Sequence, residues 1–276
     1  MLFCDLELAA RIERAECRLL SDACRSVAAR LGSVLARPIS GGFAAFTEAG
    51  SPLNKLAGLG FEGELDEAAL AEVEAHCAAH DAGVLAEVAT LADPRVARAL
   101  TRRGYELVGV ENVLGRKLLL SDAPAHRREL RIEQSGLGEL DLWLDVVVSG
   151  FAAPDAQGVA AHEQHDRAVL ERVIRDFARA DGSERYLALL DSRAVGGASM
   201  RLFEGIAQLC GAATLPDARR RGVQSALLAR RLADAGRRGC TLAVMTTQPG
   251  SKSQQNAQRL GFELLYSRNV LARDPR

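Results

Sequence analysis

The sequence lacks any apolar run near the roughly 20 residues that a membrane-spanning helix needs. Its N-terminus carries acids at Asp5 and Glu7, so it also lacks the basic and then apolar order of a signal peptide. We therefore expect no membrane partner and predict a cytoplasmic protein.

Paired cysteines and an excess of one charge are missing as well. The formal net charge is -1, so no global field favours nucleic acid, and any anion site must be local. No CxxC motif occurs, and most of the cysteines fall inside apolar periodic segments, which favours buried free thiols. The six are Cys4, Cys17, Cys24, Cys77, Cys210 and Cys240.

The chain has 276 residues, of which 48% are apolar and 26% charged. This composition is typical of an ordinary globular protein. The length fits one large α/β domain or two domains of about 130 residues each.

An internal repeat favours two domains. Residues 104–116 read GYELVGVENVLGR and residues 261–273 read GFELLYSRNVLAR, so seven of thirteen positions are identical. Chance would give about one identity at this composition. Upstream of each copy the pattern predicts helix, strand and helix, over 65–80, 84–91 and 94–103 and over 223–237, 241–247 and 252–260. Gly104 and Gly261 each stand where a helix ends, as left-handed closing residues do.

The halves are therefore predicted to be two copies of one α/β unit, with domains at 1–118 and 129–276 and a linker at 119–128. A helix is expected over 6–31, and strands over 33–37, 42–48 and 54–60. In the second copy we expect a strand at 129–133, helices near 137–149 and 159–179, and a meander of strands at 185–190, 195–203 and 206–215. The predicted fold is a mixed sheet with helices on its faces.

The most specific local pattern is LPDARRRGVQSALL at 215–228. A strand runs into Pro216, three arginines and a glycine follow, and a helix begins at once. Such a turn presents free backbone N–H groups at the positive end of a helix dipole, which suits a pyrophosphate. Gly222 would let the backbone approach the phosphate closely, and the arginines would add charge and donors at the rim.

This segment resembles the cofactor loop of the GCN5-related N-acetyltransferase (GNAT) superfamily, whose motif is Arg or Gln, two residues, Gly, one residue, then Gly or Ala. Arg219 and Gly222 match the motif, and Gln224 stands where a small residue is usual. A second motif, SQQNAQRLGF at 253–262, resembles the helix and glycine-aromatic turn that flank the pantetheine arm. The resemblance covers roughly 129–276 and implies acetyl-CoA as co-substrate. It assigns cofactor binding to Ala212, Ala213, Thr214, Leu215, Arg219, Arg220, Arg221, Gly222, Val223, Gln224, Ser225 and Asn256.

In this family the sheet splays between the fourth and fifth strands, and the pantetheine arm pairs with the open edge of the fourth. The equivalent edge here is 212–215, where small residues leave room. The resemblance further implies an oxyanion donor, a backbone N–H of the bulged strand near Ala213 to Leu215.

Catalytic side chains are harder to assign. Many family members have a tyrosine four residues before the second-motif glycine, and here that residue is Ala257. Tyr266, Ser253 and Glu163 are weak candidates, and for Tyr266 a packed strand tyrosine is the favoured interpretation. His162 and His165 share a helix face, and His76, Cys77 and His80 form another weak cluster, but solvated helix surfaces explain both better than a metal, so no metal is expected.

The first copy has no arginines at its equivalent turn. Residues 57–67 read AGLGFEGELDE, and the acids Glu62, Glu64, Asp66 and Glu67 would repel a pyrophosphate. We expect this half to have lost cofactor binding and to complete the substrate cleft, pack the active half or mediate dimerisation.

The sequence thus predicts an acetyl-CoA-dependent N-acetyltransferase that moves an acetyl group to a primary amine of a small molecule or peptide, by direct attack in a ternary complex. A homodimer is possible. One alternative is a non-catalytic acyl-CoA sensor or assembly module, supported by the missing tyrosine. The other is a dinucleotide-binding oxidoreductase, a class whose GxGxxG motif this sequence lacks.

Overall fold

The computed structural model describes residues 2–119, 122, 129–153, 159, 165–180 and 182–275. The chain divides into two compact units. The C-terminal unit comprises residues 1–2, 114–160 and 178–264, and the N-terminal unit comprises residues 3–113, 161–177 and 265–276. Within the described ranges, no helix combines the length and apolarity that crossing a membrane requires.

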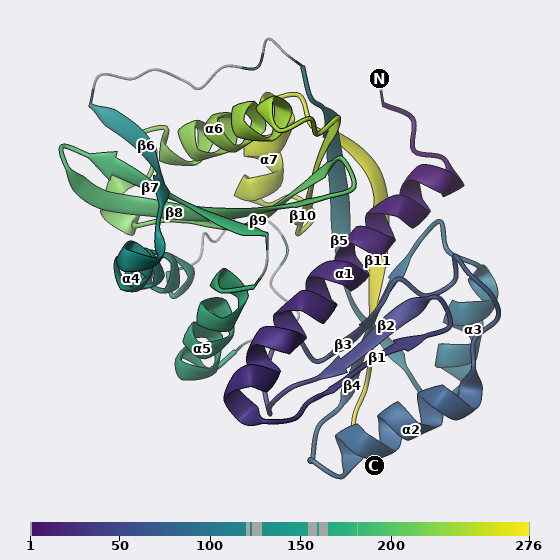
Figure 1. Cartoon of the computed structure of the whole chain (residues 1–276). Coiled ribbons are helices and arrows are strands. Elements are labelled where there is room, and N and C mark those ends of the chain that lie inside the picture. The colour runs from purple at the N-terminus through teal and green to yellow at the C-terminus, as the bar shows by residue number, and fades with distance from the viewer. Residues whose placement is uncertain are drawn as a thin grey trace. The chain divides into compact units, whose positions relative to one another are not determined.

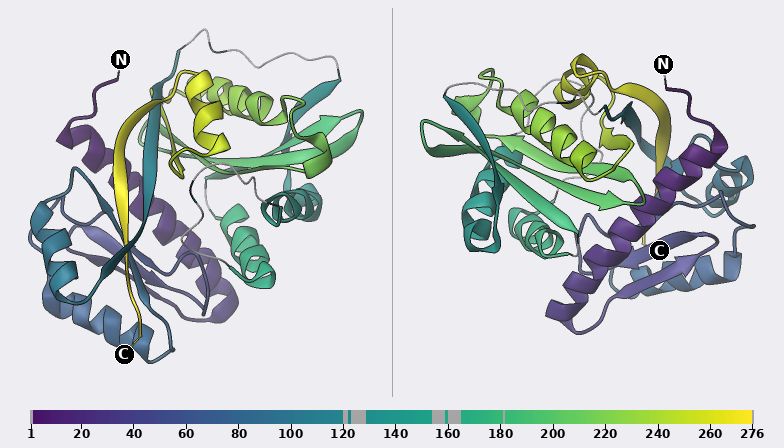
Figure 2. Two further views of the ribbon diagram at one scale, coloured as in Figure 1. Left: turned by 180° about the vertical axis from the view of Figure 1, so that it is seen from behind. Right: turned by 45° about the horizontal axis from the view of Figure 1, so that its top comes forward.

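The C-terminal unit is built on a mixed sheet whose order is β5-β10-β9-β8-β7-β6. β6 pairs with β7, and the meander β7-β8-β9 follows, all antiparallel. β10 joins β9 in parallel. Helices α4 and α6 lie on opposite faces of this sheet (Figures 1 and 2). The elements are β6 (Leu130–Ser135), a 3-10 turn η1 (Leu137–Glu139), α4 (Leu140–Phe151), β7 (Ser183–Leu190), β8 (Arg193–Phe203), β9 (Ile206–Thr214), a 3-10 turn η2 (Pro216–Ala218), α6 (Val223–Arg237), β10 (Leu242–Thr247) and α7 (Lys252–Arg259).

Two tight turns make the meander. Asp191 and Ser192 have φ of 49° and 67°, and Glu204 and Gly205 have φ of 45° and 75°. Positive φ at both central residues is the two-residue hairpin geometry that matches strand twist. The meander expected over 185–215 is confirmed, and its middle strand, β8, begins at Arg193 instead of residue 195.

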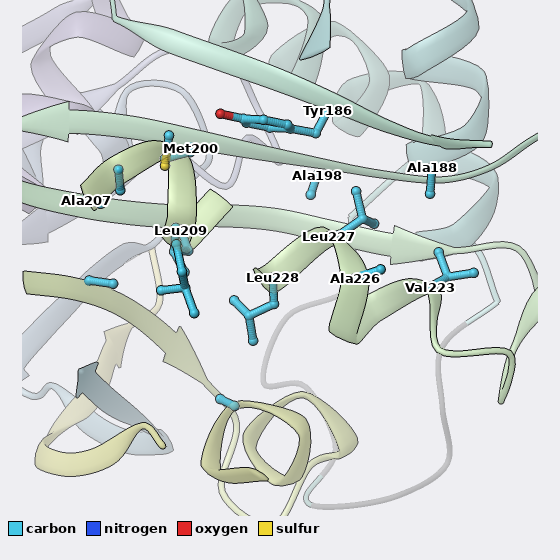
Figure 3. Close-up of a cluster of buried hydrophobic side chains, with 14 of the residues drawn as sticks. Tyr186, Ala188, Ala198, Met200, Ala207, Leu209, Val223, Ala226, Leu227 and Leu228 are labelled. Atoms are coloured by element: carbon cyan, nitrogen blue, oxygen red, sulfur yellow. The ribbon is translucent and has the colours of Figure 1, made fainter. Parts of the chain in front are cut away.

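The core of this unit lies between α6 and the sheet. Alternate strand residues such as Ala198, Met200 and Leu209 meet Leu227 and Leu228 of α6, as Figure 3 shows. Each of these residues is at most 7% exposed. Full burial of a leucine or methionine stabilises the fold by about 1.5–3 kcal/mol, so this face holds the loop before α6 in a fixed place.

The N-terminal unit has the sheet order β1-β2-β3-β4-β11-β5. β1 with β2, β2 with β3, and β4 with β11 pair antiparallel, and β3 with β4 pairs in parallel. Helix α1 covers one face, and α2 and α3 cover the other (Figures 1 and 2). The elements are α1 (Leu6–Leu31), β1 (Leu35–Ile39), β2 (Gly42–Phe46), β3 (Lys55–Ala57), α2 (Glu67–Ala78), β4 (Val84–Ala89), α3 (Pro94–Arg102), β5 (Glu106–Lys117), α5 (Arg167–Ala178) and β11 (Glu263–Arg273).

The repeated segments of the sequence lie in two long strands, β5 and β11, and each passes from one unit to the other. β5 starts in the N-terminal unit and from Leu114 belongs to the C-terminal unit. β11 starts in the C-terminal unit, and its residues 268–273 pair with β4 of the N-terminal unit. The last strand of the chain therefore completes the sheet of the first half.

Most predicted elements are confirmed within a few residues, including the helix over 6–31 and the left-handed glycines Gly104 and Gly261, with φ of 88° and 83°. The compact units differ from the predicted domain bounds at 1–118 and 129–276. Helix α5, expected at 159–179 as part of the second copy, starts at Arg167 and contributes Val173 to a core with Leu20 and Val27 of α1. Most of the linker expected at 119–128 lies outside the described residues.

Candidate cofactor and acyl-transfer site

The connection from β9 to α6 ends in an open helix N-terminus. Gly222 is the N-cap of α6, has a left-handed φ of 80° and offers no side chain to the first N–H groups of the helix. Those groups have no intrahelical partner, so they form an anion site together with the helix dipole. The preceding Arg220 is also left-handed, with φ of 62°. Two left-handed residues so close together turn the backbone sharply into the helix.

The three arginines of this loop differ in their surroundings. Arg219 is half-buried, and its Nη2 donates to the carbonyl oxygen of Ala153, just after α4. Its side chain therefore anchors the loop, and its contact with a phosphate stays a prediction. Arg220 and Arg221 are exposed. The one acid of the turn, Asp217, pairs with Arg193 at 2.6 Å, and this hydrogen bond lowers the pKa of Asp217.

The residues after Gly222 contribute through their backbone. The Val223 side chain is 2% exposed and belongs to the core of the C-terminal unit. Gln224 is half-buried and Ser225 is exposed, both in the first turn of α6. We therefore expect these three residues to contact an anion through their backbone N–H groups.

The sheet opens next to this loop. β9 and β10 pair only from Ile206 with Leu242 to Gln208 with Val244. Beyond that pair, β9 runs on to Thr214 and β10 to Thr247. The expected splay between the fourth and fifth strands of this unit is present, and the predicted edge at 212–215 lies along it.

Two hydroxyl groups at the splayed ends have unmet hydrogen-bonding capacity. The Oγ1 atoms of Thr214 on β9 and Thr247 on β10 are buried, and neither has a partner among the described residues. Thr247 is 5% exposed. A buried polar atom without a partner calls for an explanation, and a polar ligand chain between the two strands would supply one.

The bulge of β9 is at Gly211. The prediction that placed it near Ala213 to Leu215 is wrong. Ala198 pairs with Ala212 and Ser199 pairs with Cys210, so Gly211 is the extra residue of β9. Its φ of 29° suits glycine, and a Cβ there would sit 3.8 Å from Phe151 Cζ and Ser199 Oγ. Gly211 is exposed, so this position opens toward the face of the sheet that α4 covers.

Small residues on this edge bring helices close to the strands. A Cβ on Gly150 of α4 would come within 2.6 Å of Ala213 Cβ, and one on Gly196 of β8 would come within 2.6 Å of Val223 Cγ1. Ala213 is thus needed for the packing of α4. Ala212 faces the opposite side and packs against the core under α6.

Helix α7 presents the second predicted motif. Ser253 and Asn256 are half-buried, and Ala257, at the position of the family's tyrosine, is fully buried in the core. Ser251 caps the helix by accepting a hydrogen bond from the Gln254 N–H. The side chain at the position of the family's tyrosine is therefore a buried methyl group, which supplies no proton.

Tyr266 has its own partners in the N-terminal unit. It belongs to the N-terminal unit, is 5% exposed, and its hydroxyl donates to Glu13 Oε1 at 2.6 Å. Burial and the Glu13 carboxylate raise its pKa. These contacts support the packed tyrosine that the sequence favoured. Glu163 and His162 lie outside the described residues, and His165 contacts the Gly50 carbonyl oxygen at 3.0 Å.

The equivalent helix start in the N-terminal unit is closed. Asp66 is the N-cap of α2, and its carboxylate accepts from the N–H groups of Ala68 and Ala69. Glu62, Glu64 and Glu67 pair with Arg14, Arg95 and Arg103 respectively. The acids of this turn thus already bond the N–H groups at the helix N-terminus and the neighbouring arginines.

Part of the chain matches a known protein family. Residues 152–262 match the model of the acetyltransferase (GNAT) family. This segment, which contains the meander, the open helix and α7, is a GNAT-family domain. Comparison with curated protein sequences gives no match.

Solved structures share the fold over most of the chain. A GCN5-related N-acetyltransferase from Kribbella flavida is 21% identical, with a TM-score of 0.67 over 98% of this chain and 96% of that one. A tandem GNAT protein from the clavulanic acid biosynthesis pathway is 14% identical, with a TM-score of 0.60 over 85% and 78%. A putative GNAT acetyltransferase from Novosphingobium aromaticivorans is 14% identical, with a TM-score of 0.51 over 92% and 97%. The fold is that of the GNAT acetyltransferases, and it supports acyl-CoA-dependent acetyl transfer in general.

Sequence reasoning missed two residues of this region, Thr247 and Arg231. Arg231 of α6 is 1% exposed, and its guanidinium donates to the carbonyl oxygens of Ser199, Cys210 and Leu227. The sequence held a signal for it, because Arg231 follows Val223 and Leu227 at intervals of four on the apolar face of the helix.

Proposed function

We propose that this protein is an acetyl-CoA-dependent N-acetyltransferase, which transfers the acetyl group to a primary amine of a small molecule or peptide. The observation that carries the proposal is the open N-terminus of α6 at Gly222, next to the splayed ends of β9 and β10. An anion site and an unpaired strand edge side by side fit the two halves of coenzyme A, its pyrophosphate and its amide-containing arm.

The chain's own residues suit both parts of that ligand. The N–H groups of Val223 to Ser225 and the exposed cations Arg220 and Arg221 would hold the phosphates. The hydroxyls of Thr214 and Thr247 are buried without partners among the described residues and would hydrogen-bond to the amide groups of the arm. The bound thioester supplies an activated acetyl group.

Transfer by direct attack needs the acceptor amine neutral and close to the carbonyl carbon. Proximity in a ternary complex contributes several kcal/mol, of the order of the 7–11 kcal/mol reached by well-oriented intramolecular reactions. The bulge at Gly211 supports this mechanism, because an exposed bulge beside the strand edge offers backbone N–H groups to the carbonyl oxygen. Water would carry the amine proton to a base.

We further propose that only the C-terminal unit binds the cofactor. A carboxylate occupies the N-terminus of α2, so the N–H groups that would meet a phosphate already have an acceptor in Asp66. The N-terminal half is then a degenerate copy whose role is to support the active one. Its last strand, β11, comes from the second half of the chain.

A non-catalytic acyl-CoA sensor is the second candidate. Two observations favour it: Ala257 is buried where the family usually has a tyrosine, and the hydroxyl of Tyr266 is bonded to Glu13. A sensor would bind acetyl-CoA through the same loop and show no turnover.

Isothermal titration with acetyl-CoA, followed by a thiol-release assay with a panel of primary amines, tests both candidates. Micromolar binding with amine-dependent release of free CoA supports the transferase. Binding without turnover on any amine supports the sensor. Absence of acetyl-CoA binding by the folded chain contradicts both.

A further inference from the structure

A buried arginine holds the bulge of β9. The Nη1 atom of Arg231 lies 2.8 Å from the Ser199 carbonyl oxygen on β8 and 3.3 Å from the Cys210 carbonyl oxygen on β9. Its Nε lies 3.2 Å from the Leu227 carbonyl oxygen one turn earlier in α6. Arg231 thus reaches from the helix into the gap that the bulge makes between two strands.

The charge of this guanidinium has no carboxylate partner among the described residues, and its three recorded acceptors are all peptide carbonyls. Burial lowers the pKa of Arg231 to about 10, so the side chain still carries its charge near neutral pH. A buried cation without an anion costs free energy that a leucine at this position would not. Packing alone therefore does not explain an arginine here.

The contact with Cys210 sets the direction of the next N–H. Ser199 and Cys210 are register partners, and one nitrogen bonds both carbonyl oxygens, so the Cys210 carbonyl points toward β8. In a trans peptide the C=O and the following N–H point in opposite directions. The N–H of Gly211 therefore points away from β8, toward the edge of β9 that β10 leaves open beyond Gln208.

We infer that Arg231 is a positioning residue for acyl transfer, which aims and polarises the Gly211 N–H as the donor to the thioester carbonyl oxygen. This inference rests on the proposed acetyltransferase function. A cation on the carbonyl oxygen of a peptide strengthens the N–H of the same peptide as a donor, since hydrogen bonds in series polarise one another. The positive charge of Arg231 would also favour the negative charge that develops on the thioester oxygen.

The step it assists balances as follows. The amine nitrogen forms a bond to the acetyl carbon while the carbonyl π pair moves to oxygen, where the Gly211 N–H donates to it. The pair then returns, the carbon–sulfur bond breaks, and CoA leaves as the thiolate. The proton of the amine nitrogen passes to water. Arg231 itself exchanges no proton.

Arg231→Met and Arg231→Lys test the inference, with Arg237→Met as the matched control because it removes an exposed arginine from the same helix. Removal of one oxyanion donor typically costs 10²–10³-fold in kcat, so we expect about a 100-fold loss in Arg231→Met. The acetyl-CoA Kd should change less than about threefold, because the phosphate loop is intact. Millimolar guanidinium ion should restore part of the kcat of Arg231→Gly.

A readout independent of turnover is the infrared carbonyl stretch of bound ¹³C-acetyl-CoA. The wild type and Arg237→Met should lower this frequency relative to free ligand, and Arg231→Met should lose much of that shift. Circular dichroism melting identifies a variant that does not fold, and Arg231→Lys then supplies the comparison. An unchanged stretch and kcat in a folded Arg231 variant would overturn the inference and leave the proposed function standing. Failure of the wild type to bind acetyl-CoA would overturn both.

Discussion

The Nε of Arg268, near the C-terminal end of the chain, lies 2.8 Å from Oε1 of Glu13 in the first helix. Both residues are at most 2% exposed, and Tyr266 donates to the same carboxylate oxygen. Nearby, Lys55 pairs with the buried Glu87 at 2.9 Å. A buried network of charges thus fastens the last strand of the chain into the N-terminal unit.

Arg268→Met should destabilise the protein strongly, because it leaves Glu13 buried without its cation. Breaking a buried pair in this way costs about 3–5 kcal/mol. Urea unfolding measures the loss. Arg131→Met, which removes an arginine with 60% exposure, should change stability by less than about 0.5 kcal/mol. Equal midpoints for the two variants would contradict a stabilising role for the network.

Gly222→Val should weaken acetyl-CoA binding by more than about tenfold, because a side chain at a left-handed N-cap blocks the approach of phosphate to the helix. A left-handed non-glycine residue costs about 1–2 kcal/mol, so stability should also fall. Gly239→Val is the matched control, since Gly239 has φ of 81° with open space around its Cβ position. Titration calorimetry should show normal affinity in that control, and normal affinity in Gly222→Val would remove the site from this loop.

The double variant Arg220→Ala with Arg221→Ala should weaken CoA more than pantetheine, because only CoA carries the phosphates that these exposed side chains would meet. Arg219→Ala should act differently and lower stability, since Arg219 bonds the Ala153 carbonyl oxygen. Competition binding with both ligands measures the difference. Equal losses for the two ligands in the double variant would show that the arginines act on the fold.

One acetyl-CoA should bind per chain, because the carboxylate of Asp66 already caps the only equivalent helix start in the described part of the first half. Asp66→Ser keeps a capping side chain and removes the charge, and we expect the stoichiometry to stay at one. Titration to saturation provides the number. Two equivalents in the wild type would require a second site in the N-terminal unit.

Stability should depend on pH through Glu111, whose pKa burial and the neighbouring Glu87 raise from 4.5 to about 7. The folded state then binds this proton more tightly than the unfolded state, so the contribution of Glu111 is fully present below about pH 4.5 and is lost as pH rises through about 7. The unfolding free energy of the wild type minus that of Glu111→Gln should therefore fall from pH 5 to pH 8, because only the wild type has a carboxyl group that becomes charged. The exposed Glu106→Gln is the control, and a constant difference for Glu111→Gln would contradict the raised pKa.

Local patterns determined much of this protein. Apolar periodicity marked α1 over its full length, and glycines at 104 and 261 marked two helix ends, because period and left-handed geometry act within a few residues. The repeat marks β5 and β11, and the arginine-glycine pattern marks the open start of α6. The GNAT-family domain was recognised from the same loop.

The tertiary structure alone decided which unit each element joins and which groups are already bonded. β11 and α5 complete the N-terminal unit because Arg268, Tyr266 and Val173 find partners there that lie far away along the chain. The bulge is at Gly211 because register between β8 and β9 is a property of the pair and not of either strand. Arg219 lies in the loop and Arg231 in the helix that follows it, yet only packing shows that the first bonds a backbone carbonyl after α4 and the second bonds the carbonyl oxygens of Ser199 and Cys210.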